Sequence, residues 1–174
     1  MTVDIINISD DFETIALRSS LEYWGVKVSL HLIGKAQDLV DVLDGQTPIS
    51  PNIVLMCHGV DAGIVLPELA PSIAQQQPYK NFLTPANISQ FIKLPDAIVI
   101  NTGCATGNQA FAQAFLKNGA THYIAPGNYP DGNASLFFLL NFYYYHLAQS
   151  WPVETAYTKA HAADQDTNMF MHYS

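Results

Sequence analysis

The chain is arranged around one segment, Ala97-Ile98-Val99-Ile100-Asn101-Thr102-Gly103-Cys104-Ala105-Thr106-Gly107. Its four apolar residues from Ala97 to Ile100 predict a strand that is buried on both faces, and residues 108–116 predict the helix that follows. Cys104 therefore falls in the turn between this strand and this helix. In an open parallel sheet such turns lie at the carboxyl edge, where ligands bind.

A second apolar run ends in the same way, with a histidine at its tip. This run is Ile53-Val54-Leu55-Met56-Cys57-His58-Gly59. If the two strands are neighbours in a parallel sheet, His58 and Cys104 project from the same edge into one cleft.

The composition bounds the class of protein. The 174 residues are 49% hydrophobic and 13% charged, which predicts a single domain, residues 1–174, with a sizeable core. A net charge of −8 without any basic cluster argues against nucleic acid or an anionic membrane as a partner. We find no positively charged leader and no apolar stretch near the roughly 18 residues of a membrane span, so we expect a soluble, cytoplasmic protein. We expect Cys57 and Cys104 to be free thiols.

Along the chain, short apolar runs alternate with helical patterns. This alternation predicts an α/β fold of three α/β/α layers, with a mainly parallel sheet in the strand order 2-1-3-4-5. The predicted strands are residues 4–8, 26–33, 53–56, 97–100 and 121–125. The second of these alternates apolar and polar residues, which is typical of an edge strand.

The helical patterns carry their own start and stop signals. Asp10 and Glu13 resemble a capping box, and the helix after them is expected to bury the face that holds Phe12, Ile15, Ala16, Ser19 and Tyr23. Thr84 and Pro85 predict another helix start. The remaining helices are predicted around residues 39–43, 108–116, 136–147 and 153–163.

Residues 60–81 form the least regular part of the sequence. Their three prolines, at positions 67, 71 and 78, exclude a long helix. Because the segment follows His58 directly, we expect it to form a mobile wall of the cleft.

The pair of Cys104 and His58 suits nucleophilic catalysis. A helix N-terminus after Cys104 would lower the pKa of its thiol, and His58 could protonate a leaving amine. The backbone N–H groups of Gly59 and Cys104 could bind an oxyanion, and glycine at 59 and 103 lets a substrate approach closely. The alternatives remain a small buried cysteine and a histidine that caps a loop.

Other reactive or aromatic side chains favour structural roles. Cys57 precedes His58 on one strand, so its side chain should point to the opposite face, into the helix layer. A zinc site with His58 and Cys104 would lack a fourth ligand, and we expect neither a metal nor a cofactor. Histidines 31, 122, 146, 161 and 172 are expected to be structural or solvated. The aromatic residues of 137–145 should form core and one outer face, which leaves room for a homo-oligomer contact.

An ordered set of segments resembles the caspase-like clan of cysteine peptidases, with the nearest likeness to its gingipain-like and CHAT-domain members. Cys57-His58-Gly59 is similar to the histidine motif of that clan, and Asn101 to Gly107 is similar to its cysteine motif. Four further segments fit in the same order: residues 82–88, 110–120, 141–147 and 153–160. The resemblance covers about residues 50–164.

The resemblance implies a caspase-like, flavodoxin-like sandwich that hydrolyses a peptide or protein substrate through a thioester, without a metal in catalysis. Cys104 and His58 would then be catalytic with the Gly59 amide, and Gly103, Asn128 and Asp131 would contact substrate. Asp131 matches a motif position from which an acidic residue recognises a basic side chain, and a carboxylate there would favour Arg over Lys. The segment Tyr129-Pro130-Asp131-Gly132 is equally compatible with an ordinary turn.

Three departures from the family pattern bear on substrate and regulation. The family's aromatic Trp-x-x-x-Asp step after the fifth strand appears here as Asn128-Tyr129-Pro130-Asp131. Cys57 stands where the family usually has Gly or Ser before the histidine, and no attached repeat or sensor domain is present in this sequence. A catalytically inactive caspase-like scaffold that only binds a partner is therefore one alternative. A flavodoxin-like or receiver module is another, but the turn at Asn7 to Asp11 lacks a phosphate-binding glycine run, and His58 stands where a receiver needs an aspartate.

Overall fold

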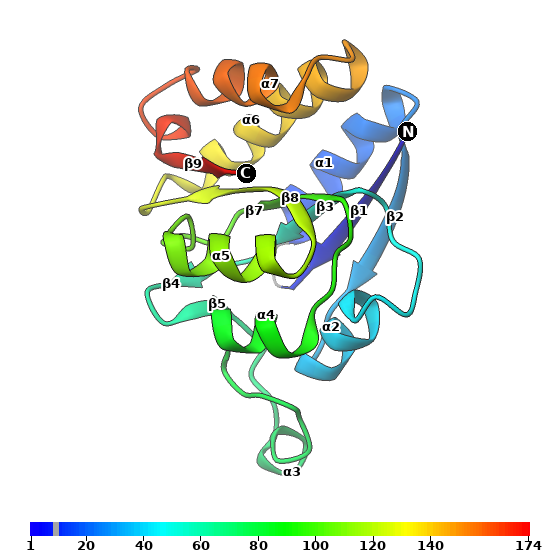
Figure 1. Ribbon diagram of the computed structural model, residues 1–174, viewed down its shortest axis with the longest axis vertical. Helices are drawn as coiled ribbons and strands as arrows, with labels where there is room; N and C mark the ends of the chain where they lie inside the picture. Colours follow the sequence, from blue (N-terminus) through cyan, green and yellow to red (C-terminus); the bar gives the residue numbers. More distant parts are fainter. Residues whose placement is uncertain (9–10) are drawn as a thin grey trace.

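The computed structural model describes residues 1–8 and 11–174, and a six-stranded sheet forms its centre (Figure 1). The strands lie in the order β2 (Lys27–Leu32), β1 (Thr2–Asn7), β3 (Asn52–Met56), β7 (Ala97–Asn101), β8 (Ala120–Pro126) and β9 (Phe170–Tyr173). The first five pair in parallel, which confirms the predicted order 2-1-3-4-5. The antiparallel sixth strand, β9, was not predicted.

The central strands carry apolar residues on both faces, as their sequences predict. In β3, Ile53 and Leu55 belong to one core cluster, whereas Val54 and Met56 belong to the other. Strand β2 lies at the edge and is only partly buried, so the prediction of an edge strand is confirmed. Successive residues of a strand point to opposite faces, and helices must therefore cover both sides of this sheet.

Helices cover the two faces in two groups of three (Figure 1). One face carries α2 (Ala36–Leu43), α4 (Pro85–Phe91) and α5 (Gln109–Lys117). The other carries α1 (Asp11–Tyr23), α6 (Gly132–Tyr143) and α7 (Val153–His161). The predicted three-layer α/β/α arrangement is confirmed.

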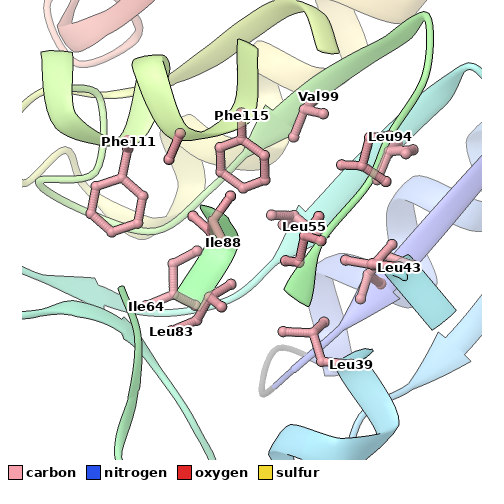
Figure 2. Close-up of a cluster of buried hydrophobic side chains, with 14 of the residues drawn as sticks. Leu39, Leu43, Leu55, Ile64, Leu83, Ile88, Leu94, Val99, Phe111 and Phe115 are labelled. Atoms are coloured by element: carbon pink, nitrogen blue, oxygen red, sulfur yellow. The ribbon is translucent and has the colours of Figure 1, made fainter. Parts of the chain in front are cut away.

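The core under α2, α4 and α5 joins the sheet to all three helices. Figure 2 shows Phe111 and Phe115 of α5 with Ile88 of α4 on one side, and Leu39 with Leu43 of α2 on the other. Among the residues drawn, Leu55, Ile64, Leu83, Leu94 and Val99 complete this layer. Burying these side chains contributes about 1.5–3 kcal/mol each relative to leaving them exposed.

The predicted buried face of α1 is wrong. Phe12, Ile15 and Tyr23 are 90%, 59% and 88% exposed, whereas Leu17 and Leu21 are fully buried. These two leucines belong to the core cluster that also holds residues of β1 and α6, so the helix turns its leucine stripe inward. The predicted capping box at Asp10 lies outside the described residues.

Residues 60–81 are more regular than their prolines predict. A small antiparallel sheet contains β4 (Gly59–Val60), β5 (Gly63–Val65) and β6 (Phe82–Leu83), and a short helix, α3 (Pro71–Ala74), lies at the far end of the segment (Figure 1). The prolines are compatible with this structure because they lie outside the strands, and Pro71 occupies the first position of α3. The capped start at Thr84 is confirmed: its hydroxyl accepts from the Asn87 N–H at 3.3 Å.

The aromatic segment changes helix type before it ends. Helix α6 passes into a π-helical turn, Tyr144–Ala148, and a short 3-10 turn, Thr167–Met169, precedes β9. Phe138, Phe142 and Tyr143 are fully buried, whereas Phe137 and Tyr144 are 46% and 43% exposed, so the predicted division into core and outer face is confirmed. Among the described residues, no helix is long and apolar enough to cross a membrane.

Candidate active site

Gly59 lies directly against the Gly103–Cys104 peptide. A Cβ atom added at Gly59 would stand 2.7 Å from the Gly103 carbonyl carbon and 2.8 Å from the Cys104 nitrogen, and it would also collide with the Cys104 oxygen. All three atoms belong to the backbone, so no side-chain motion could make room. The end of β3 and the turn after β7 therefore meet at the carboxyl edge of the sheet, as the two sequence runs predict.

The β4–β5 hairpin determines which way the Gly59 amide points. The Val65 N–H donates to the His58 carbonyl at 2.9 Å, and Gly59 pairs next with Ile64. Hydrogen-bonded and non-bonded pairs alternate in an antiparallel ladder, so the Gly59 N–H points away from β5. Because β4 is an edge strand of the small sheet, no neighbouring strand among the described residues lies on that side of Gly59.

The Cys104 turn is held by a buried network of polar side chains. The Asn101 Oδ1 accepts from the Gly103 N–H at 2.8 Å, and its Nδ2 donates to the Thr106 hydroxyl at 3.0 Å. Thr106 donates in turn to the Gly103 carbonyl at 2.5 Å. Burial raises the pKa of the Tyr123 phenol well above its usual range, so it stays protonated and donates to the Thr106 carbonyl at 3.1 Å.

The loop after β8 supports the other side of the turn. The Ala105 N–H donates to the Asn128 carbonyl at 3.0 Å, and the Gly107 N–H donates to the Pro126 carbonyl at 2.7 Å. Ala105 adopts a φ of 60°, a left-handed conformation that is uncommon for any residue with a Cβ. Strain of this kind persists only where the surrounding contacts impose it, and it clusters at functional sites.

A hydrogen bond crosses from one wall of the site to the other. The Tyr129 hydroxyl, in the loop after β8, donates to Asp61 Oδ1 in the β4–β5 turn at 3.2 Å. Desolvation and the nearby Asp61 carboxylate raise the pKa of the Tyr129 phenol, and Cys104 also contributes to this increase. Tyr129 follows Asn128, whose carbonyl accepts from the Ala105 N–H, and Asp61 lies two residues after Gly59, so both partners belong to segments that contact the Cys104 turn. The sequence did not predict this contact, because Asp61 and Tyr129 belong to no common motif.

The thiol of Cys104 does not have the lowered pKa that the sequence suggests. Helix α5 begins only at Gln109, with Asn108 as its capping residue, so its N-terminus does not reach Cys104. Burial raises the pKa of the Cys104 thiol, and a hydrogen bond from its own backbone N–H offsets part of this effect. In the resting protein the sulfur is therefore mainly a thiol, and a base must remove its proton before it attacks.

The structure brings some predicted site residues together and leaves one apart. Gly59, Gly103 and Cys104 are in contact, and Asn128 is linked to the same turn through its carbonyl. The exposed side chain of His58 precedes Gly59 at the end of this edge. Asp131 is exposed at the start of α6, and within the described residues no hydrogen bond or ion pair joins it to the Cys104 turn.

Cys57 has the structural position that alternation along the strand predicts. It is buried in the core under α2, α4 and α5 and donates from Sγ to Asn101 Oδ1 at 3.0 Å.

In the part of the chain that the structure describes, no three His, Cys, Asp or Glu side chains form a group that could hold a metal ion. A cavity of about 460 Å³ is lined by Ala36 and by residues between Val65 and Phe82, and by none of Gly59, Gly103 or Cys104.

Comparison with solved structures identifies the fold. No family model matches the sequence, and no curated protein matches it either. The Arg-specific cysteine proteinase gingipain R has a similar structure, with a TM-score of 0.61 and 12% identity over 97% of this chain. The complex of the pro- and mature domains of Porphyromonas gingivalis RgpB gives a TM-score of 0.65, with 11% identity over 100% of this chain. The chain has a caspase-like fold.

A third solved structure also resembles this chain. The Saccharomyces cerevisiae separase–securin complex matches 99% of this chain with a TM-score of 0.60 and 12% identity. The chain spans 44% and 47% of the two gingipain chains and 11% of the separase chain. At sequence identities of 11% and 12%, these similarities establish the fold of the chain but not its chemistry.

Proposed function

We propose that this chain is a caspase-like cysteine peptidase that uses Cys104 as nucleophile and His58 as its acid–base partner. The observation that carries the proposal is the contact of Gly59 with the Gly103–Cys104 peptide, because it brings the end of the histidine strand against the cysteine turn. Gingipain R, which is RgpB and shares the fold, is a cysteine proteinase by description. A peptide or protein is therefore the proposed substrate.

The reaction follows from the state of the two side chains. His58 accepts the proton of the Cys104 thiol while Sγ attacks the scissile carbonyl carbon. The N–H groups of Cys104 and Gly59 donate to the oxyanion that forms. The C–N bond then breaks, and the proton on His58 passes to the amine, which leaves. Water attacks the resulting thioester with His58 as base, and the proton returns to Sγ as the acid product departs.

Asp131 is the proposed determinant of specificity for a basic side chain before the scissile bond. Its carboxylate does not cap its own helix and is exposed, so it is free to pair with an arginine. One neighbour, gingipain R, is described as Arg-specific. Asp131→Asn should remove a preference for Arg, whereas Asp96→Asn, at the opposite edge of the sheet, should leave it unchanged. Cleavage without any preference for Arg or Lys contradicts this assignment but not the role of Cys104.

Incubation with a diverse peptide library tests the peptidase proposal. The wild type should generate new peptide termini at a shared set of sites, detected by mass spectrometry, and Cys104→Ala should generate none. Absence of cleavage by the wild type would instead favour a caspase-like scaffold that binds a partner without hydrolysing it. Equal cleavage by Cys104→Ala would contradict the proposed nucleophile.

A further inference from the structure

Asn101 uses its full hydrogen-bonding capacity within the buried turn. Its Oδ1 accepts from the Gly103 N–H and from Cys57 Sγ, and its Nδ2 donates to Thr106 and to Tyr123, at 3.0 and 3.1 Å. Both Asn101 and Thr106 are fully buried. An amide has two acceptor lone pairs and two donor hydrogens, so this side chain is completely satisfied. A network of this kind specifies one arrangement of the groups that it joins.

The network holds the Gly103 residue at both of its backbone groups. Asn101 binds the Gly103 N–H, and the Thr106 hydroxyl binds the Gly103 carbonyl. No cis peptide occurs among the described residues, and in a trans peptide the carbonyl and the following N–H point in opposite directions. Because Thr106 fixes the carbonyl on the buried side, the Cys104 N–H must point the other way.

That direction is the one that the proposed reaction needs. The Cys104 N–H belongs to the same residue as the proposed nucleophile, and it points away from the Thr106 hydroxyl that holds the Gly103 carbonyl. It donates to no backbone carbonyl of residues 1–8 or 11–174. The Cys104 N–H is therefore left without a backbone acceptor on the side of the turn opposite the Thr106 hydroxyl, where it can donate to an oxyanion.

We propose that Asn101, Thr106 and Tyr123 are positioning residues that orient the Gly103–Cys104 peptide so that the Cys104 N–H can donate to the oxyanion. The inference rests on the proposed peptidase function and extends it to residues that touch no substrate. Thr106 acts on the Gly103 carbonyl, Asn101 links Thr106 to the Gly103 N–H, and Tyr123 holds the Thr106 carbonyl from strand β8.

Two reagents distinguish a misoriented Gly103–Cys104 peptide bond from general damage to the site. A peptide aldehyde, built on the best-cleaved library sequence, adds to Cys104 and forms an oxyanion, whereas iodoacetamide alkylates the thiol without forming one. Thr106→Val should weaken aldehyde binding about 10- to 100-fold, because the oxyanion donor is no longer held in place, and should leave the alkylation rate within about twofold. Thr106→Ser keeps the hydroxyl and should restore aldehyde binding.

Thr14→Val is the matched control. Thr14 is also a buried threonine, but its hydroxyl has no hydrogen-bond partner within the described part of the chain, so its loss should affect neither reagent. Equal losses of aldehyde binding and alkylation in Thr106→Val would overturn the orienting role, as would full retention of both.

Amide hydrogen exchange provides a readout that does not depend on activity. Asn101→Ala should accelerate exchange of the Gly103 N–H, measured by NMR, because that N–H loses its acceptor. If the wild type neither binds the aldehyde nor cleaves peptides, the peptidase function is contradicted, and exchange at Gly103 alone then decides whether the network holds the turn. Unchanged exchange in Asn101→Ala and in Thr106→Val would overturn the inference.

Discussion

Tyr129 donates a hydrogen bond of 3.2 Å to Asp61, and this contact joins the loop after β8 to the turn of the β4–β5 hairpin. Both side chains are exposed, and each belongs to a segment that contacts the Cys104 turn, one through Asn128 and the other through Gly59. The contact therefore spans the two walls beside the candidate nucleophile. A substrate that occupies the site must fit around this contact or break it.

Removing the Tyr129 hydroxyl should make the site easier to enter. A hydrogen bond between exposed groups is weak, so Tyr129→Phe should raise the rate of Cys104 labelling by a bulky peptide electrophile by no more than about fivefold. Labelling by iodoacetamide should not change, since this small reagent needs no opening. Tyr23→Phe, on the outer face of α1, serves as the control. A slower reaction of Tyr129→Phe with the bulky reagent would show that the hydroxyl helps to bind substrate instead.

The contact at Gly59 predicts an intolerance to any side chain. Gly59→Ala places a Cβ against three backbone atoms of the Cys104 turn, and overpacking of this kind costs about 1–3 kcal/mol of unfolding free energy. Chemical denaturation should reveal this loss, together with a loss of Cys104 reactivity toward the peptide aldehyde. Gly34→Ala is the matched control, because its Cβ would meet only the flexible side chain of Asp38 at 3.5 Å. Equal stability of the two variants would refute the close approach.

A pair of histidines joins β8 to the C-terminal strand β9 and makes stability depend on pH. His122 Nδ1 and His172 Nε2 lie 3.0 Å apart, so one ring must be neutral to accept the hydrogen bond. Burial lowers the pKa of both rings, and His122 further lowers that of His172. As the pH falls below the ordinary histidine value of about 6.5, the unfolded chain takes up protons first, so the free energy of unfolding decreases.

Denaturation curves measured between pH 5 and pH 8 should show this decrease only on the acidic side, with a plateau above the unfolded pKa. His172→Gln should reduce the pH dependence, because the amide can still accept or donate a hydrogen bond but does not titrate in this range. His161→Gln, outside the pair, should leave it unchanged. A stability that rises as the pH falls would contradict the lowered pKa values.

The segment between β5 and β6 should be the first to be cut by a non-specific protease. Residues 66–81 project from the body of the fold and hold only the short helix α3 (Figure 1). Local unfolding costs little free energy where few buried contacts must break, so proteinase K should cleave there before anywhere else in the domain. Mass spectrometry of the first fragments identifies the site. Earlier cleavage within α6 would contradict the expectation that residues 60–81 are mobile.

The parallel sheet could be predicted from the sequence because its central strands have unusually simple patterns. Ile53 to Met56 and Ala97 to Ile100 are apolar on both faces, which only a strand covered on both sides explains. Strand β9 could not be recognised, because it is only four residues long and Phe170 is its only fully buried residue. The tertiary pairing with β8, and not the local sequence, makes it a strand.

Helix α1 shows how composition can mislead. Phe12, Ile15 and Tyr23 are apolar or aromatic and share a face, yet the narrower stripe of Leu17 and Leu21 is the one that packs on the sheet. The two stripes compete at the same helical period, so the sequence alone cannot decide between them. Contact with α6 and β1 decides it in the folded chain.

The site itself was only partly visible in the sequence. The glycines beside His58 and Cys104 could be recognised because close backbone approach requires them. The network of Asn101, Thr106 and Tyr123 could not, since its members follow no period and come from two strands and a turn. The raised pKa of the Cys104 thiol was also missed, because its main cause is burial of the thiol in the folded chain, which the local sequence does not show.

The most direct test of the account is covalent labelling by peptidyl acyloxymethyl ketones that carry Arg, Leu, Asp or Phe at the reactive position. At least one reagent should add a single equivalent to the wild type, mapped to Cys104 by peptide mass spectrometry. Cys104→Ala should take up none, Cys57→Ala should react like the wild type, and His58→Ala should react about 100-fold more slowly for lack of its proton acceptor. Labelling that persists in Cys104→Ala, or that proceeds at the wild-type rate in His58→Ala, would contradict the proposed nucleophile and base.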